Sequence, residues 1–333
     1  MKAIKFLGEN RIAIVNQEKP KAQDDIIIVK VTSSGICGTD IELLLPAKTP
    51  LDTTPGHEVT GIVSEVDKAL NFKVGDRVMV NCHVTCGKCE HCKRGNLIFC
   101  PELKAIGFEL DGGNAEFLAI PEASLRHLPE DIDDEIAVII GDTLGTPYHA
   151  VEKAEIKPGE FVGIFGVGPL GQMAVLVAKS FGAKVIATDL DKKRLEMSRN
   201  FGSDYLINPS EVDTVAEIMK ITRGKGIDKA VQCTPSASAI NDALNSLKLR
   251  GRLVQVGVCT RLEINPFKQI NNKEIEIVGS RNFNNNELGE IIEFARKNPK
   301  IKDIITHRFN LDEAEKAFET ARTGEGLKVL IKP

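Results

Sequence analysis

The pattern of apolar and polar positions changes its character near residue 146. Before that point the chain carries short apolar runs at 26–36, 58–66, 75–80 and 115–120, with Gly, Asp and Pro between them. Alternation of this kind, punctuated by turn residues, is typical of short strands. The first 130 residues are therefore expected to form an irregular, mostly β domain.

From about residue 146 short apolar runs alternate with segments of helical period. The predicted strands lie at 161–165, 184–189, 205–208, 227–233, 251–257 and 275–280. The predicted helices between them lie at 169–181, 192–201, 215–223 and 238–248. This rhythm indicates βαβ units, and hence a doubly wound parallel sheet with helices on both faces.

The C-terminal tail does not continue this rhythm. A helical pattern at 284–299 is followed by "ITHRF" and by a last strand, "LKVLIKP". We therefore assign the tail to the first domain. The expected domains are 1–145 with 284–333, and 146–283, in line with a chain too long for one ordinary core.

Composition excludes several classes of protein. The net charge of −4 offers no basic field for nucleic acid or for an anionic membrane. Charges interrupt the N-terminus before a signal peptide could form, and no apolar run approaches the roughly 18 residues of a membrane span. The expectation is a cytoplasmic protein with no membrane and no nucleic-acid partner.

A glycine motif, G-x-G-x-x-G, follows the strand at 161–165 and opens the next helix. Its first glycine allows a tight turn, its second lets a pyrophosphate approach the backbone, and its third permits close packing of helix on strand. In a βαβ series this favours a dinucleotide site over a structural turn. The residues assigned to it are Gly166, Gly168, Pro169, Leu170 and Gly171.

Asp189 ends the second strand of that series, 23 residues after Gly166. A carboxylate there can accept hydrogen bonds from both ribose hydroxyls of NAD and would repel the 2′-phosphate of NADP. The alternative is an aspartate that caps a turn. Lys192, Lys193 and Arg194 follow and can weaken the discrimination, so NAD is favoured while NADP stays open, and Arg194 is assigned to the cofactor site.

Five of the eight cysteines fall between residues 82 and 100. Four of them, Cys86, Cys89, Cys92 and Cys100, have the spacing C-x2-C-x2-C-x7-C. Four thiolates can close a tetrahedral structural zinc site. An iron–sulfur cluster is the chief alternative, and a nucleic-acid-binding zinc ribbon is opposed by the acidic charge. Cys82 and His83 are interpreted as bystanders.

A second group of candidate ligands is dispersed along the chain. "GICGTD" contains Cys37, and "PGHEV" contains His57 and Glu58. Asp142 stands alone in the apolar stretch 135–151, where an unpaired carboxylate costs several kcal/mol to bury. One cysteine and one histidine on separate loops prove little by themselves, since an isolated histidine is usually structural.

The order "GICGTD", "GHE", "GDRV", the four cysteines, "YHA" and G-x-G-x-x-G resembles the zinc-dependent medium-chain alcohol and polyol dehydrogenases. The resemblance extends from about Met1 to the terminal "KVLIKP". It implies an α/β protein with a GroES-like, mostly β catalytic domain, which carries a catalytic and often a structural zinc, and a Rossmann domain that binds NAD(P).

The resemblance assigns the catalytic zinc to Cys37 and His57. The family's third ligand varies among Cys, Glu and Asp, and Asp142 stands at its place. A thiolate, a neutral histidine and a carboxylate neutralise Zn²⁺ and leave a fourth position for substrate. Glu58 lies near the metal in the family and can replace water there, while Asp40 would orient His57.

The resemblance also implies a proton relay and cofactor contacts. Thr39 matches the hydroxyl residue that takes the alcohol proton. The histidine that completes the relay in several members is Glu42 here, so the final acceptor stays open. The resemblance also assigns four cofactor contacts, Thr146, Thr234, Val256 and Val258. The alternative is that these residues only pack at strand ends.

These observations predict a zinc-dependent, NAD-preferring dehydrogenase with two zinc ions per chain. Its substrate would be a secondary alcohol, a polyol or a sugar hydroxyl, and family members are dimers or tetramers, with a homotetramer favoured at this size. The rivals are a zinc-free quinone or enoyl reductase of the same fold and a catalytically silent binding protein. Both would dispense with the ligand set that this chain retains.

Overall fold

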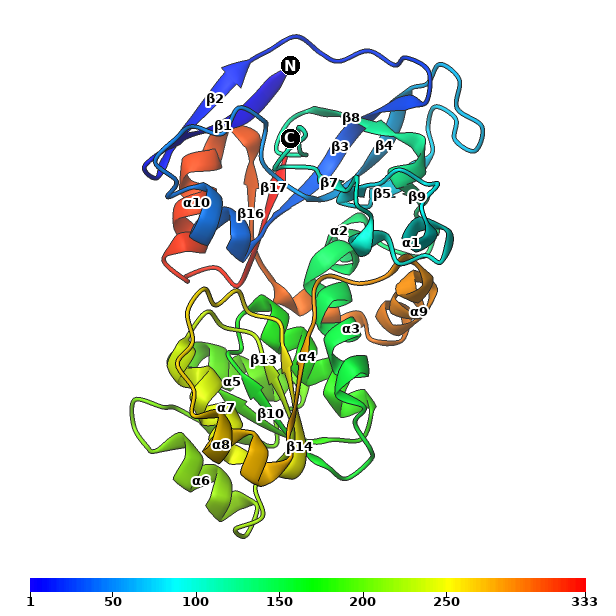
Figure 1. Cartoon of the computed structure of the whole chain (residues 1–333). Helices are drawn as coiled ribbons and strands as arrows, with labels where there is room; N and C mark the ends of the chain where they lie inside the picture. The colour runs from blue at the N-terminus through cyan, green and yellow to red at the C-terminus, as the bar shows by residue number, and fades with distance from the viewer. The chain divides into compact units, whose positions relative to one another are not determined.

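The structure, a computed structural model, describes residues 1–333 except for the side chain of Leu43. By its own contacts the chain separates into two compact units. Unit 1 comprises Met1–Thr143 and Asn284–Pro333, and unit 2 comprises Leu144–Phe283 (Figure 1).

Unit 1 is built on strands. A seven-stranded sheet has the order β16-β17-β3-β4-β5-β9, with β8 paired to β3, and β1-β2 and β6-β7 form two small two-stranded sheets. The strands are β1 Lys2–Gly8, β2 Arg11–Asn16, β3 Ile26–Ile36, β4 Glu58–Glu65, β5 Arg77–Val80, β6 His83–Val84, β7 Lys104–Ala105, β8 Phe117–Pro121, β9 Leu125–His127, β16 Ile305–Asn310 and β17 Lys328–Lys332. The helices are α1 Glu90–Lys93, α2 Asp134–Ile139, α9 Leu288–Lys297 and α10 Ala314–Arg322.

The strand pattern of unit 1 explains its core. Along β3, Ile27, Val29 and Val31 point to one side and are buried against β4 and β5 residues such as Val59 and Val78, as the two-residue period of a strand requires. A second core lies under α10, where Phe318 meets Phe6 edge to face at 5.1 Å between ring centroids. The mostly β prediction for the first domain is confirmed.

Unit 2 is a six-stranded, all-parallel sheet of the Rossmann type, with the order β12-β11-β10-β13-β14-β15. Helices α3, α4 and α5 pack beside one another, and α6 packs on α7, so that both faces are covered. The strands are β10 Phe161–Phe165, β11 Lys184–Thr188, β12 Tyr205–Ile207, β13 Ile227–Gln232, β14 Leu247–Gln255 and β15 Glu276–Gly279. The helices are α3 Gly145–Ala154, α4 Pro169–Ser180, α5 Lys192–Phe201, α6 Thr214–Ile221, α7 Ala237–Ser246 and α8 Pro266–Gln269.

Several helices were missed by the sequence pattern. The stretch 135–151 forms α2, the π-helical turn η4 Ile140–Leu144, and α3. Every residue from Gly145 to Val151 is buried, and a helix that is buried all round has no amphipathic period to detect. Helices α8 and α10 were also not predicted. Among the described residues, no helix combines the length and apolar character needed to cross a membrane.

The start of α2 carries a charge cluster centred on Glu135. Its carboxylate accepts two hydrogen bonds of 2.8 Å from Arg308 and lies 3.0 Å from Lys332 and 3.4 Å from Lys302. The Arg308 hydrogen bonds, with help from Lys332, lower the pKa of Glu135 to about 2. The cluster joins α2 to the C-terminal strands of unit 1.

Glu135→Gln is expected to lower the free energy of unfolding at pH 7 by about 2 kcal/mol, because three cations lose their common partner. A lowered carboxylate pKa adds stability that is complete above the ordinary value of 4.5 and is lost as the pH falls toward about 2. The difference from the parent protein should therefore vanish near pH 2 in urea titrations. The exposed Glu325→Gln is the matched control, and an equal effect of both substitutions would contradict the prediction.

Candidate active site and metal centres

The pairing of β3 with β4 brings the first candidate ligands together. Gly35, near the end of β3, lies opposite Glu58, the first residue of β4. Cys37 follows β3 directly and His57 precedes β4 directly, so the antiparallel register places them at the same edge of the sheet. Asp142 reaches this edge from η4.

The side chains of these segments form one compact group. The Asp142 Oδ2 atom lies 3.4 Å from Cys37 Sγ and 3.7 Å from His57 Nε2. With Glu58, one ligand atom from each of the four residues lies within 4.8 Å of the others. The site is nearly closed to solvent, since His57 is 7% and Asp142 is 9% exposed.

The charges of this group favour a bound cation. Burial raises the pKa of the Cys37 thiol, and the Asp142 carboxylate raises it further. Burial lowers the pKa of His57, but Cys37 and Asp40 outweigh this and raise it well above its ordinary value. A dication at the centre would reverse both preferences, because it stabilises thiolate and neutral imidazole ligands. The donor types and their closeness thus fit zinc.

Asp40 contacts the backbone of Cys37 and lies beside the ring of His57. Its Oδ2 accepts a 3.0 Å hydrogen bond from the Cys37 backbone N–H. Its Oδ1 lies 3.7 Å from His57 Nδ1, and both atoms are buried without a closer hydrogen-bond partner. This arrangement leaves His57 Nε2 facing the group, as expected for a metal ligand whose other nitrogen is held by a carboxylate.

Glu58 has a partner that the sequence did not suggest. Lys328, from β17, places its Nζ 2.5 Å from each Glu58 carboxylate oxygen, and the two side chains are 1% and 0% exposed. Thr143 lies 3.2 Å from Glu58 Oε2 through its hydroxyl. The detectable signal was a lysine inside an otherwise apolar strand pattern, "LKVLI".

The two relay candidates lie differently. The Thr39 hydroxyl is 3.3 Å from Cys37 Sγ. Glu42 lies on the π-helical turn η1 Asp40–Leu44 and is exposed. The structure therefore brings Thr39 into contact with the ligand group.

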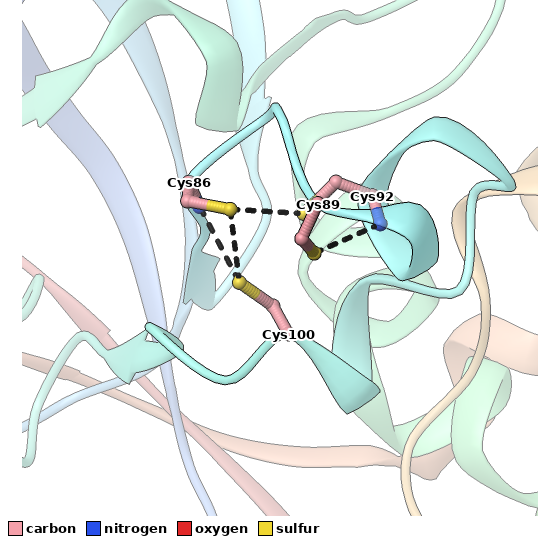
Figure 2. A group of neighbouring side chains, drawn as sticks. All are labelled: Cys86, Cys89, Cys92 and Cys100. Carbon is pink, nitrogen blue, oxygen red and sulfur yellow. Dashed lines mark hydrogen bonds between the residues drawn. The ribbon is translucent and has the colours of Figure 1, made fainter.

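The four closely spaced cysteines converge in a separate lobe, where their side chains point toward one another (Figure 2). The sulfur of Cys86 lies 3.6 Å from that of Cys100 and 3.9 Å from that of Cys92. A tetrahedral site with Zn–S bonds of about 2.3 Å requires sulfurs about 3.8 Å apart. The lobe fits a closed structural zinc site.

The neighbouring pair Cys82 and His83 joins neither group of metal-ligand residues. Burial raises the pKa of Cys82 to about 12. A buried, protonated thiol of this kind behaves as a small apolar side chain.

In unit 2 the glycine motif has the geometry of a phosphate-binding turn. Gly166 has φ +86°, and a Cβ on Gly171 would stand 1.9 Å from the Gly166 carbonyl oxygen. Asp189 accepts a 2.8 Å hydrogen bond from the Val167 N–H and a 2.9 Å bond from the Asp191 N–H. It thus lies against the glycine turn. The side-chain amide of Gln172, which was not singled out from the sequence, bonds the Val167 carbonyl at 2.9 Å and helps to hold the turn.

Two of the remaining cofactor candidates, Arg194 and Thr234, lie against this turn. A Cβ built on Gly168 would lie 3.9 Å from Nη1 of Arg194. A Cβ built on Gly166 would lie 2.9 Å from Cβ of Thr234, which follows β13. Val256 follows β14, and Val258 is 55% exposed. Thr146 is buried in α3.

A parallel nucleotide-type sheet in one unit and a Cys–His–carboxylate group in the other define a metal-dependent dehydrogenase. Comparison with known families agrees. Residues 23–130 match the alcohol dehydrogenase GroES-like domain, and residues 169–297 match the zinc-binding dehydrogenase domain. The chain belongs to the zinc-binding medium-chain alcohol and polyol dehydrogenase family, and it is a zinc-dependent NAD(P) dehydrogenase that acts on CH–OH groups.

Individual relatives are similar over their whole length. A sorbitol dehydrogenase of Halalkalibacterium halodurans is 33% identical, with 98% of this chain and 97% of that protein covered. An L-threonine 3-dehydrogenase of Rhizobium johnstonii is 32% identical, with coverages of 99% and 98%. Among solved structures, an alcohol dehydrogenase from Thermus sp. ATN1 has a TM-score of 0.92 at 28% identity, covering 100% of this chain and 99% of that one.

Proposed function

We propose that Cys37, His57 and Asp142 hold the catalytic zinc and that the cysteine lobe holds a structural zinc. This proposal is supported by one observation: the side chains of Cys37, His57 and Asp142, from distant segments, lie in contact in one largely buried group whose charges favour a cation. A thiolate, a neutral imidazole and a carboxylate balance the metal charge and leave one position for substrate.

Different residues of the chain have separate roles in the proposed reaction. Zinc, when bound, polarises the oxygen of an alcohol or carbonyl and so lowers the pKa of the alcohol. Asp40 holds His57 in one orientation, and Thr39 is placed to take the hydroxyl proton. The glycine turn and Asp189 would hold the pyrophosphate and a ribose of the dinucleotide, which would supply hydride transfer with the substrate carbon. The final proton acceptor after Thr39 is solvent or the exposed Glu42 in this proposal.

Asp142→Asn is expected to lower kcat/KM by about a hundredfold and to weaken zinc retention, because the amide keeps an oxygen donor but loses the charge that balances the metal. The measurement is steady-state kinetics together with metal content after dialysis. Asp303→Asn, an exposed aspartate of the same unit, is the control. Full activity and full zinc content in Asp142→Asn would mean that the third ligand is another residue.

We propose NAD as the preferred cofactor, with Asp189 as the discriminating residue. Asp189→Asn should lower kcat/KM for NAD by about tenfold and raise that for NADP, because it removes one strong acceptor and the charge that repels a 2′-phosphate. Asp191→Asn serves as the control, since asparagine caps a helix as well as aspartate. An unchanged NAD-to-NADP ratio in Asp189→Asn would refute this assignment, and Arg194 would become the residue to vary.

The proposed substrate is a secondary alcohol, polyol or sugar hydroxyl, consistent with the sorbitol and threonine dehydrogenases among the relatives.

We propose functional domains at 1–145 with 284–333 and at 146–283. We also propose that the protein is a cytoplasmic homo-oligomer, with a tetramer favoured over a dimer. The edge strand β15 supports self-association, because it ends the sheet order and its Ile277 is 45% exposed.

The test is a screen of alcohols, polyols and sugars with NAD and NADP, followed by the absorbance of the reduced nicotinamide. Metal analysis should find two zinc ions per chain, one for each ligand group. One zinc with reductase activity on quinones would favour the zinc-free reductase. Two zinc ions without turnover or cofactor binding would favour a silent binding protein.

A further inference from the structure

The most unusual charge in unit 1 is Lys328. Its side chain is 1% exposed and lies in the apolar strand β17, which pairs with β3 through Leu330 opposite Gly35 (Figure 1). A buried ammonium group persists only when it is paired and hydrogen-bonded.

Its contacts join the three ligand-bearing segments. Nζ contacts both Glu58 oxygens at 2.5 Å and donates to the Ile36 carbonyl at 3.0 Å. Ile36 precedes Cys37 and Glu58 follows His57. Thr143, which follows Asp142, donates to the same carboxylate at 3.2 Å. One carboxylate–ammonium pair is thus bonded next to every proposed ligand.

The sheet makes room for this pair at Gly35. A Cβ there would stand 2.7 Å from Glu58 Oε2 and 3.0 Å from Lys328 Cε. A side chain at this position would force the Glu58 carboxylate to shift, so glycine here leaves the space in which the two side chains meet. The pair is a built feature of the strand crossing and not a chance surface contact.

The charges explain why the pair matters. The proposed ligands and Zn²⁺ sum to zero, and Glu58 with Lys328 also sums to zero. Without the lysine, Glu58 would be an unpaired buried anion whose nearest remaining cation is the metal. Because one Glu58 oxygen already belongs to the group within 4.8 Å, only a small movement separates the two arrangements.

We propose that Lys328 is a positioning residue that holds Glu58 off the catalytic metal and so keeps the fourth coordination position open for substrate. This inference rests on the proposed function, since it requires a metal held by Cys37, His57 and Asp142. In this proposal Lys328, 270 positions from Glu58 in the sequence, determines whether Glu58 stays off the metal or binds it.

The test uses protein in which cobalt replaces zinc, with imidazole as a probe of the open position. In the parent protein imidazole should shift the visible cobalt bands. In Lys328→Met, Glu58 fills the position, so the bands should no longer respond, chelators should remove the zinc about tenfold more slowly, and KM should rise more than kcat falls. Lys328→Arg keeps the charge and should respond like the parent.

The double variant Glu58→Gln with Lys328→Met should regain the imidazole response, because residue 58 then has no charge that would draw it to the metal. If Lys328→Met alone does not fold, Glu58→Gln and the double variant are compared, and they should respond alike. A normal imidazole response in Lys328→Met, or a double variant that differs from Glu58→Gln, would overturn the proposal. Failure of the proposed function has a separate signature, which is uptake of two cobalt ions per chain in Cys37→Ala, where only the ion in the cysteine lobe should remain.

Discussion

Replacing Cys37 with alanine is expected to reduce dehydrogenase activity by about a thousandfold or more, because the metal contributes several kcal/mol of transition-state stabilisation. Zinc content should fall from two ions to one per chain, since only the cysteine lobe keeps its ligands. The melting temperature should change little, because the sheet register that forms the site does not depend on the thiol. Kinetics, metal analysis and thermal denaturation check the three results.

The matched control is Cys259→Ala, which removes a cysteine outside both ligand groups. It should keep two zinc ions and full activity. Cys37→Ala with two zinc ions and unreduced turnover would contradict the catalytic site as a whole.

Replacing Cys89 with alanine should instead act on stability. The secondary structure in the lobe is α1, with four residues, and the 3₁₀ turn η2 Leu97–Phe99, and helices so short are not stable alone. In small zinc domains the binding free energy, about 10–16 kcal/mol, is folding free energy. Loss of the metal should therefore unfold the lobe, which limited proteolysis would detect as cleavage between residues 86 and 100.

The consequence should extend beyond the lobe. Arg94 and Gly95 accept hydrogen bonds from Asn286 and Asn285, which stand where the chain re-enters unit 1. The melting temperature should fall by several degrees, and the zinc at Cys37 should remain. Cys259→Ala again serves as the control. A protease-resistant lobe in Cys89→Ala would show that the cysteines pack without metal.

Local sequence was enough to predict a structural feature wherever the residues that form it are close together in the chain. The strand–glycine turn–helix unit, the closing acid Asp189 and the four-cysteine lobe each lie within about 25 residues, and short-range backbone chemistry determines them. The helices at 134–154 were missed for the opposite reason. Residues 137–139 of α2 and 145–151 of α3 are all buried, and only packing distinguishes such a helical stretch from an apolar strand.

The sequence by itself determined the class of fold, the nucleotide turn and the presence of two sets of metal-binding residue types. It also marked Asp142 as a charge without a local partner, and Lys328 carried the same signal. Only the tertiary structure decided how these charges are satisfied. Asp142 meets Cys37 across 105 residues and Lys328 meets Glu58 across 270. Contacts of such separation depend on the pairing of β3 with β4 and β17, because a shift of one residue in that register would turn every side chain to the other face.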